Sequence, residues 1–235
     1  MPESTTRIHF QEELAELERQ ALEGLDMVAV ALQRALETVQ HQDVELASMV
    51  IADDDRIDGR YLEVHQGVLS LLARQAPVAG DLRTVAAILH LIKHVERMGD
   101  QCVNIAKLVP LAGHEPPAEE RLLDNIQRMG ACAGQLVVQC KQAFARRDVA
   151  LAQDLVRQDD EIDRLNRDCF TIALEIGDDA DRREWAMHMM LVARCIERVG
   201  DNAVDIGEQT AFVVTGLFRE FEDASHPELS PGPAR

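Results

Sequence analysis

The feature that most constrains this chain is a duplication in which each half carries the same motifs in the same order. The segment Glu96–Asp100 reads ERMGD, and 101 residues later Glu197–Asp201 reads ERVGD. Earlier in the first half, residues 43–47 and 54–58 read DVELA and DDRID, and 105 residues further on the chain reads DVALA and DDEID. Around these motifs apolar residues recur at every third and fourth position, which is typical of helices with one buried face. The matching halves therefore predict two similar helical units.

The apolar periodicity predicts three helices in each half. Those of the first half begin near residues 8, 44 and 81, and those of the second near 118, 148 and 180. The segment Pro110–Pro117 reads PLAGHEPP and is the Pro/Gly-rich break in mid-chain, which favours a boundary there. We therefore predict an all-α fold of two tandem three-helix bundles, at residues 8–110 and 117–220, related by internal duplication. The polar, proline-containing residues 223–235 are expected to form a disordered tail.

Composition limits the possible ligands and compartments. Hydrophobic residues make up 46% of the chain and aromatic residues only 3%, so aliphatic side chains must fill the core. The formal net charge of −18 repels nucleic acid and anionic lipid, and favours cations and basic protein surfaces as partners. Five cysteines without a C-x-x-C pair indicate reduced thiols in a cytoplasmic protein. No apolar run approaches the roughly 18–20 residues of a membrane-spanning helix, so we expect no direct membrane insertion.

Oxygen-bearing side chains form a stripe on the third predicted helix of each half. Glu96, Asp100 and Asn104 are spaced by four residues, and on a helix this spacing places them along one face. The second half repeats the spacing with Glu197, Asp201 and Asp205. Like charges spaced by four residues repel each other. Either water screens these carboxylates or a cation binds them.

The second helix of each half adds two more carboxylates. A short loop makes the second and third helices antiparallel, so their acidic flanks either face each other or both turn away. If they face, the first carboxylate cluster consists of Asp54, Asp58, Glu96 and Asp100. The second carboxylate cluster then consists of Asp159, Asp163, Glu197, Asp201 and Asp205. Such clusters suit Mg²⁺, Mn²⁺, Ca²⁺, iron or Zn²⁺, whereas the plainer interpretation is a solvated acidic face.

Other residues give weaker signals. Gly99 and Gly200 lie inside predicted helices, where glycine costs about 1 kcal/mol against alanine, and indicate either close backbone approach or tight helix packing. His90 and His94 point away from the carboxylate stripe by about 120° or more. We interpret His94 and His188 as packing or surface residues, and Cys102 as an inert core thiol. The chain has no H-E-x-x-H motif, Gly-rich phosphate loop or Ser/His/Asp arrangement.

The motifs together resemble those of the PhoU family, accessory regulators of bacterial phosphate-specific transport. The resemblance rests on the duplicated E-R-x-G-D, followed by Asn104–Ile105 or Asp205–Ile206, and on Arg74–Arg83, which reads RQAPVAGDLR. The second linker, Gly177–Arg183, lacks the proline. The resemblance implies two three-helix bundles with metal motifs at the ten carboxylate and asparagine positions named above. It implies bound iron, zinc, manganese or magnesium.

The same resemblance implies a biological role. It implies a cytoplasmic homodimer that restrains the phosphate-starvation response, with the ATPase subunit of the phosphate transporter and a membrane sensor histidine kinase as partners. The leading hypothesis is therefore a non-enzymatic regulatory adaptor whose bound cations shape a docking surface. The alternatives are a metal-dependent phosphate-ester hydrolase, because carboxylate-bound metals can support such chemistry, and a purely structural helical scaffold.

Overall fold

The computed structural model describes residues 2–112 and 119–221, and within them the chain is all-α, as predicted. Its first half contains α1 (Pro2–His41), α2 (Val44–Asp53), α3 (Asp55–Arg74), α4 (Ala79–Leu108) and the 3₁₀ turn η1 (Val109–Ala112). Its second half contains α5 (Glu120–Arg146), α6 (Val149–Glu175) and α7 (Ala180–Thr215). The described part contains no strand. The predicted tail, 223–235, lies outside the described residues.

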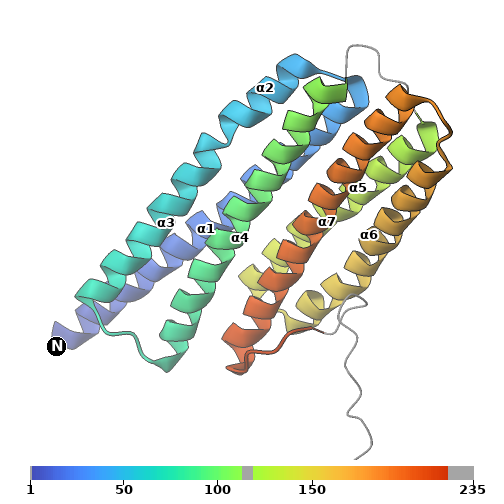
Figure 1. Cartoon of the computed structure of the whole chain (residues 1–235). Coiled ribbons are helices and arrows are strands. Elements are labelled where there is room, and N and C mark those ends of the chain that lie inside the picture. Colours follow the sequence, from blue (N-terminus) through green and yellow to red (C-terminus); the bar gives the residue numbers. More distant parts are fainter. Residues whose placement is uncertain (1, 113–118, 222–235) are drawn as a thin grey trace, which may run out of the picture.

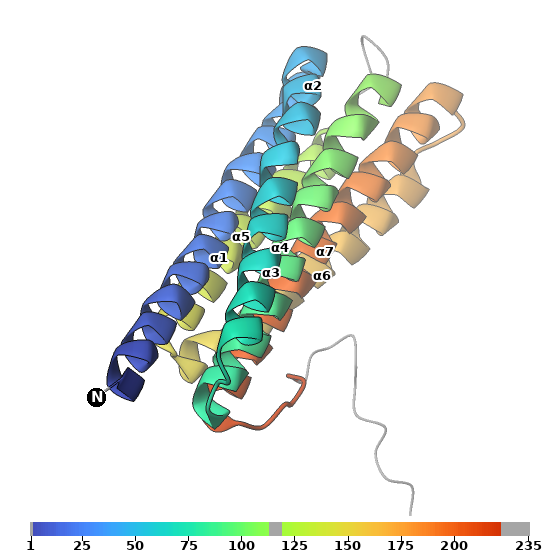
Figure 2. The same ribbon diagram turned by 90° about the vertical axis from the view of Figure 1, so that its left-hand side faces the viewer.

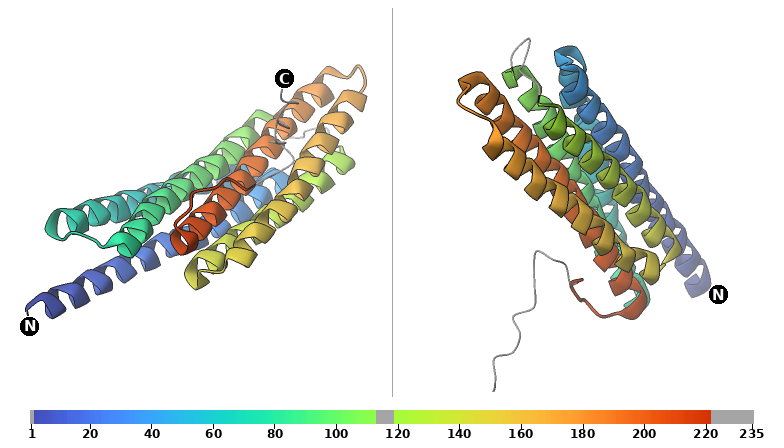
Figure 3. Two further views of the ribbon diagram at one scale, coloured as in Figure 1. Left: turned by 90° about the horizontal axis from the view of Figure 1, so that it is seen from below. Right: turned by 90° about the vertical axis from the view of Figure 1, so that its right-hand side faces the viewer.

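The helices form two groups of three that lie side by side along one common direction. Figure 1 shows α1, α3 and α4 in one group and α5, α6 and α7 in the other, with α2 extending α3. The side view shows the first group in front of the second (Figure 2). The groups meet where α4 packs against α7 and α1 against α5, and Figure 3 shows α4 beside α7 from below. One continuous core of buried aliphatic residues joins both groups.

The turn before the second helix has the same geometry in both halves. Asp43 and Asp148 each accept a hydrogen bond on the side chain from a backbone N–H three residues on, at 2.8 Å and 3.0 Å. The residues before them, Gln42 and Arg147, both adopt the left-handed conformation, with φ of 53° and 55°. A side-chain cap of this kind stabilises a helix by about 1 kcal/mol. The duplication seen in the sequence thus extends to backbone conformation.

Three helix boundaries differ from the sequence expectation. The first helix begins at Pro2 rather than near residue 8, because proline suits the first helical position. The second helix is interrupted at Asp54, whose carbonyl accepts from the N–H groups of both Ile57 and Asp58, at 2.8 Å and 3.0 Å. By contrast, α6 is unbroken. The last helix ends at Thr215, before the predicted end of the second bundle at residue 220, because Gly216 takes a φ of 74° and caps it.

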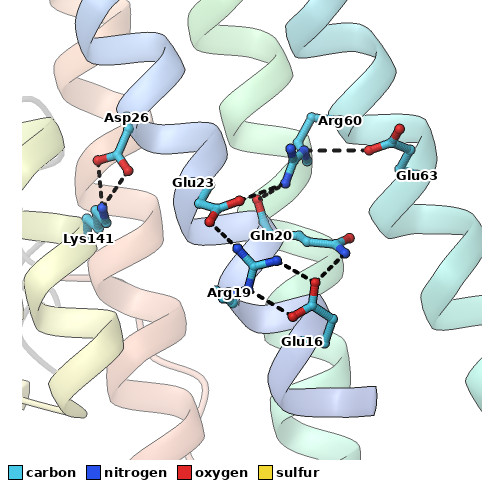
Figure 4. A network of polar contacts seen from close by, with 8 residues as sticks. All are labelled: Glu16, Arg19, Gln20, Glu23, Asp26, Arg60, Glu63 and Lys141. Atoms are coloured by element: carbon cyan, nitrogen blue, oxygen red, sulfur yellow. Dashed lines mark hydrogen bonds and ion pairs between the residues drawn. The ribbon is translucent and has the colours of Figure 1, made fainter. Parts of the chain in front are cut away.

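Ion pairs connect α1 to a helix of each group. Arg60 of α3 lies 3.1 Å from Glu23, and Lys141 of α5 binds Asp26 at 2.6 Å (Figure 4). Arg19 pairs with Glu23 along α1 itself. These side chains are at least partly exposed to solvent, so each pair contributes about 0–1 kcal/mol. Their main effect is to help fix the position of α1 between α3 and α5.

Candidate metal centres

The first carboxylate cluster forms where α3 packs against α4. Burial raises the pKa of Asp54, and together with the neighbouring charges of Asp58 and Asp100 it brings this pKa to about 6. The pKa of Asp100 is also raised, first by burial and then by Glu96 and Asp58. Carboxylates perturb one another in this way only at close range. The acidic flanks of the two helices therefore face each other across this seam.

The second carboxylate cluster forms in the same way between α6 and α7. Burial raises the pKa of Glu197, and with the charges of Asp201 and Asp163 it brings this pKa to about 7 although Arg194 opposes the rise. Glu197 is only 7% exposed. Its Oε1 accepts from Arg194, whereas its Oε2 is buried and has no hydrogen-bond partner among the described residues. Such an oxygen is costly to leave unpaired.

The two helical glycines bring the second helix of each half close to the third. A β-carbon added at Gly99 would lie 2.9 Å from Oδ1 of Asp54 and 3.1 Å from Ile57. At Gly200 it would collide with Oδ1 of Asp159 and lie 3.1 Å from Ile162. These glycines therefore allow both close backbone approach and tight helix packing, because a carboxylate oxygen and a core isoleucine both lie against the backbone there. At both glycines, the space left by the missing side chain is occupied by a carboxylate that was predicted to bind metal, that of Asp54 or Asp159.

Two of the predicted site residues lie apart from these groups. Asn104 is exposed on α4 and makes no hydrogen bond to the other predicted ligands within the described residues. Asp205 is half-buried, and its Oδ2 lies 3.5 Å from Nδ1 of His94. His94 belongs to α4, so Asp205 is directed towards the first half of the chain. The predicted stripe on α7 therefore ends with a residue that faces α4.

His94 is the residue that the sequence argument undervalued. It was interpreted as a packing or surface residue, and it is buried, with its Nδ1 2.7 Å from Oδ1 of Asn202 on α7. Asn202 donates its Nδ2 to the carbonyl of Arg198 at 2.6 Å, so Oδ1 must accept and Nδ1 of His94 carries the proton. Burial lowers the pKa of His94. Its offset from the carboxylate stripe indicated that His94 does not join those carboxylates, but helical angles on one helix could not show that it faces α7.

The side chains as placed do not complete a coordination shell. Within the described residues, no three His, Cys, Asp or Glu side chains are positioned to share one ion. The donor chemistry nevertheless fits a hard cation: Asp54, Asp100 and Glu197 have raised pKa values, and Oε2 of Glu197 is unpaired. A cation would offset this repulsion.

A family model described as the PhoU domain matches the chain twice, at residues 22–109 and 126–210. The chain belongs to the PhoU family. Among curated proteins it is similar to a PhoU homolog of Zymomonas mobilis, with 32% identity over 88% of this chain and 87% of that protein. It is also similar to PhoU homolog 2 of Mycobacterium tuberculosis, with 28% identity over 90% of this chain and 99% of that protein. Both are named phosphate-specific transport system accessory proteins.

Solved PhoU structures share the fold. The crystal structure of PhoU from Streptococcus pneumoniae superposes with a TM-score of 0.82 at 26% identity, covering 89% of this chain and 99% of that one. PhoU from Pseudomonas aeruginosa gives a TM-score of 0.79 at 26% identity, covering 88% and 100%. The two domain matches correspond to the two halves predicted from the repeated motifs. None of the described helices has the length and apolarity to cross a membrane.

Proposed function

We propose that this PhoU-family chain is a cytoplasmic regulator of phosphate uptake and of phosphate-starvation signalling. It acts as a non-enzymatic adaptor between the ATPase subunit of a phosphate transporter and a membrane sensor histidine kinase. The observation that carries this proposal is the PhoU-domain match to both halves, at residues 22–109 and 126–210. Relatives matched over nearly their whole length are named accessory proteins of phosphate-specific transport. A homodimer is part of the same proposal.

We also propose that the two carboxylate clusters bind metal ions, with iron, zinc, manganese or magnesium as candidates. Support comes from the raised pKa of Asp54 and Glu197, the glycines that admit Asp54 and Asp159 to the backbone of the next helix, and the unpaired oxygen of Glu197. Carboxylate oxygens bind hard cations. In this proposal the cations neutralise acidic seams and so shape the surface that partners contact.

A pull-down from phosphate-replete cells, with and without a chelator, tests the adaptor role. We expect the transporter ATPase and the sensor kinase to be captured by the wild-type chain, and to be lost with chelator or with the Glu96→Ala plus Glu197→Ala variant. The matched control is Asp124→Ala plus Glu184→Ala, which removes two exposed acidic side chains outside both clusters. Equal capture by all three proteins would contradict the metal-dependent adaptor and support the scaffold alternative.

A phosphatase assay addresses the hydrolase alternative. We expect no turnover of a phosphate monoester with Mn²⁺ by the wild-type chain above the Glu96→Ala plus Glu197→Ala variant. Turnover that requires both Mn²⁺ and Glu197 would replace the adaptor proposal with a metal-dependent hydrolase.

A further inference from the structure

A groove of about 670 Å³ lies where the two halves of the chain meet. Its α4 wall carries His90, His94 and Arg97, and its α7 wall carries Glu197, Asp201 and Asp205. Figure 1 shows these two helices side by side. The volume falls in the range typical of small-ligand sites. The groove therefore places basic groups of one half opposite the second carboxylate cluster of the other.

One end of the groove is bordered by the segment Leu217–Phe221, which follows α7. The backbone N–H of Phe221 donates to Oε1 of Glu208 at 2.6 Å, and the ring of Phe218 contacts Phe212 with centroids 5.9 Å apart. Both Phe218 and Phe221 line the groove. This segment therefore adds side chains to the groove beside those of α4 and α7.

Arg97 supplies a positively charged side chain to this groove. Its guanidinium group is exposed and makes no ion pair or hydrogen bond within the described residues. Arg194, the other guanidinium of the groove, is already paired with Glu197. Arg198 stands at the position equivalent to Arg97 in the second half but does not line the groove. Arginine binds oxyanions through paired N–H donors, so Arg97 offers an anion site beside the carboxylates.

Charge balance decides how an anion could bind there. Six carboxylates line the groove: Asp159, Glu197, Asp201, Asp205, Glu208 and Glu220. Against them stand two guanidinium groups, those of Arg97 and Arg194, which leaves an excess of four negative charges when all six are ionised. An anion is repelled from such a groove unless cations bind first. The buried, unpaired Oε2 of Glu197 is an independent sign that a cation belongs at this wall.

We propose that the groove binds inorganic phosphate together with divalent cations, the cations being held by the carboxylates of α7 and the phosphate by Arg97 of α4. This inference rests on the proposed metal centre and extends it with a ligand. Phosphate oxygens suit both partners, because hard cations and guanidinium groups prefer them. The site needs both halves of the chain, and the bond between His94 and Asn202 fixes their relative position beside it.

Titration calorimetry with inorganic phosphate as the probe tests this proposal. We expect phosphate to bind the Mn²⁺-loaded chain and not the chelator-treated chain. Arg97→Gln should weaken phosphate binding about tenfold or more, the loss of one charge-assisted pair, while Mn²⁺ affinity stays within about twofold. Arg198→Gln is the matched control and should bind phosphate as the wild type does. Broadening of the phosphorus-31 signal of phosphate by bound Mn²⁺ provides a second readout.

The outcomes separate this inference from the metal proposal beneath it. If Mn²⁺ binds and phosphate does not, the phosphate site is overturned and the metal centre stands. If Mn²⁺ does not bind, both are overturned. Equal phosphate affinity in Arg97→Gln would remove the groove as the site, and phosphate binding without a cation would refute the charge argument. Displacement of phosphate by acetate at similar concentration would show that the groove binds carboxylates as well as it binds phosphate. Such a site would suit an acidic side chain of a partner protein, and phosphate would be overturned as the ligand.

Discussion

Oδ1 of Asp159 occupies the space that a β-carbon would need at Gly200. The equivalent pair, Asp54 and Gly99, is looser, with 2.9 Å between the oxygen and the β-carbon position. Asp159 is 6% exposed, so its carboxylate has little room to move aside, whereas Asp54 is half-buried. The second half therefore has the tighter contact between carboxylate and helix backbone.

We expect Gly200→Ala to destabilise the fold by about 1–3 kcal/mol, because overpacking a buried contact outweighs the helix propensity of alanine. Gly99→Ala should cost less, since Asp54 can shift towards solvent. Gly134→Ala is the control: Gly134 lies inside α5 with no atom within 4 Å of the added β-carbon, so it should stabilise by about 0.5–1 kcal/mol. Urea unfolding measures all three. A neutral Gly200→Ala would show that Asp159 is not confined there.

The stability of the metal-free chain should fall as pH rises from about 4.5 to about 7. The ordinary pKa of a glutamate is 4.5, and burial beside Asp201 raises that of Glu197 to about 7. In this window the folded state keeps a proton that the unfolded state has lost, so folding weakens with rising pH. For Glu197 the effect is on the order of 2–3 kcal/mol. Below the window the contribution is fully present, and above it the contribution is gone.

Glu197→Gln isolates this contribution, because glutamine mimics the protonated side chain. The stability of Glu197→Gln relative to wild type should grow between pH 4.5 and 7 and then level off. Glu184→Gln, an exposed substitution on the same helix, should follow the wild-type curve. A constant difference between Glu197→Gln and wild type across this range would show that Glu197 does not titrate there.

Metal binding should oppose this loss and release protons. A divalent cation binds ionised carboxylates, so Mn²⁺ or Zn²⁺ added at pH 6 should displace protons from Asp54 and Glu197. At a concentration a hundredfold above Kd the cation stabilises by about 2.7 kcal/mol, which corresponds to a rise in Tm of several degrees. Scanning calorimetry and proton-release titration measure the two effects. Asp54→Asn plus Glu197→Gln should abolish both, and an unchanged response would place the metal elsewhere.

The hydrogen bond between His94 and Asn202 should stabilise the contact between the halves. His94→Ala leaves the buried amide oxygen of Asn202 unpaired, and we expect a cost of about 1–3 kcal/mol. A double-mutant cycle with Asn202→Ala should give a coupling energy of about 0.5–1.5 kcal/mol. His90→Ala, on the exposed face of the same helix, is the control. Additive effects of the two substitutions would mean that the bond contributes nothing beyond packing.

Much of the fold follows from repetition and periodicity, and the departures have physical causes. The spacing of Glu96 and Asp100, and of Asp54 and Asp58, predicted an acidic flank on each helix but left open whether the two flanks face each other. It could not predict that Asp205 faces His94, because helical angles within one bundle carry no information about a neighbouring bundle. The interruption at Asp54 was equally hidden, since Asp159 occupies the same place in the repeated D-D-x-I-D motif and lies in an unbroken helix.

That interruption gives an equivalent carboxylate two different backbone settings. The carbonyl of Asp54 accepts from two amide groups between α2 and α3, and the carboxylate of the same residue belongs to the first carboxylate cluster. Asp159, its counterpart in the second half, lies inside one unbroken helix. The repeated motif therefore presents its first acidic residue from a boundary between two helices in one half and from a helix interior in the other.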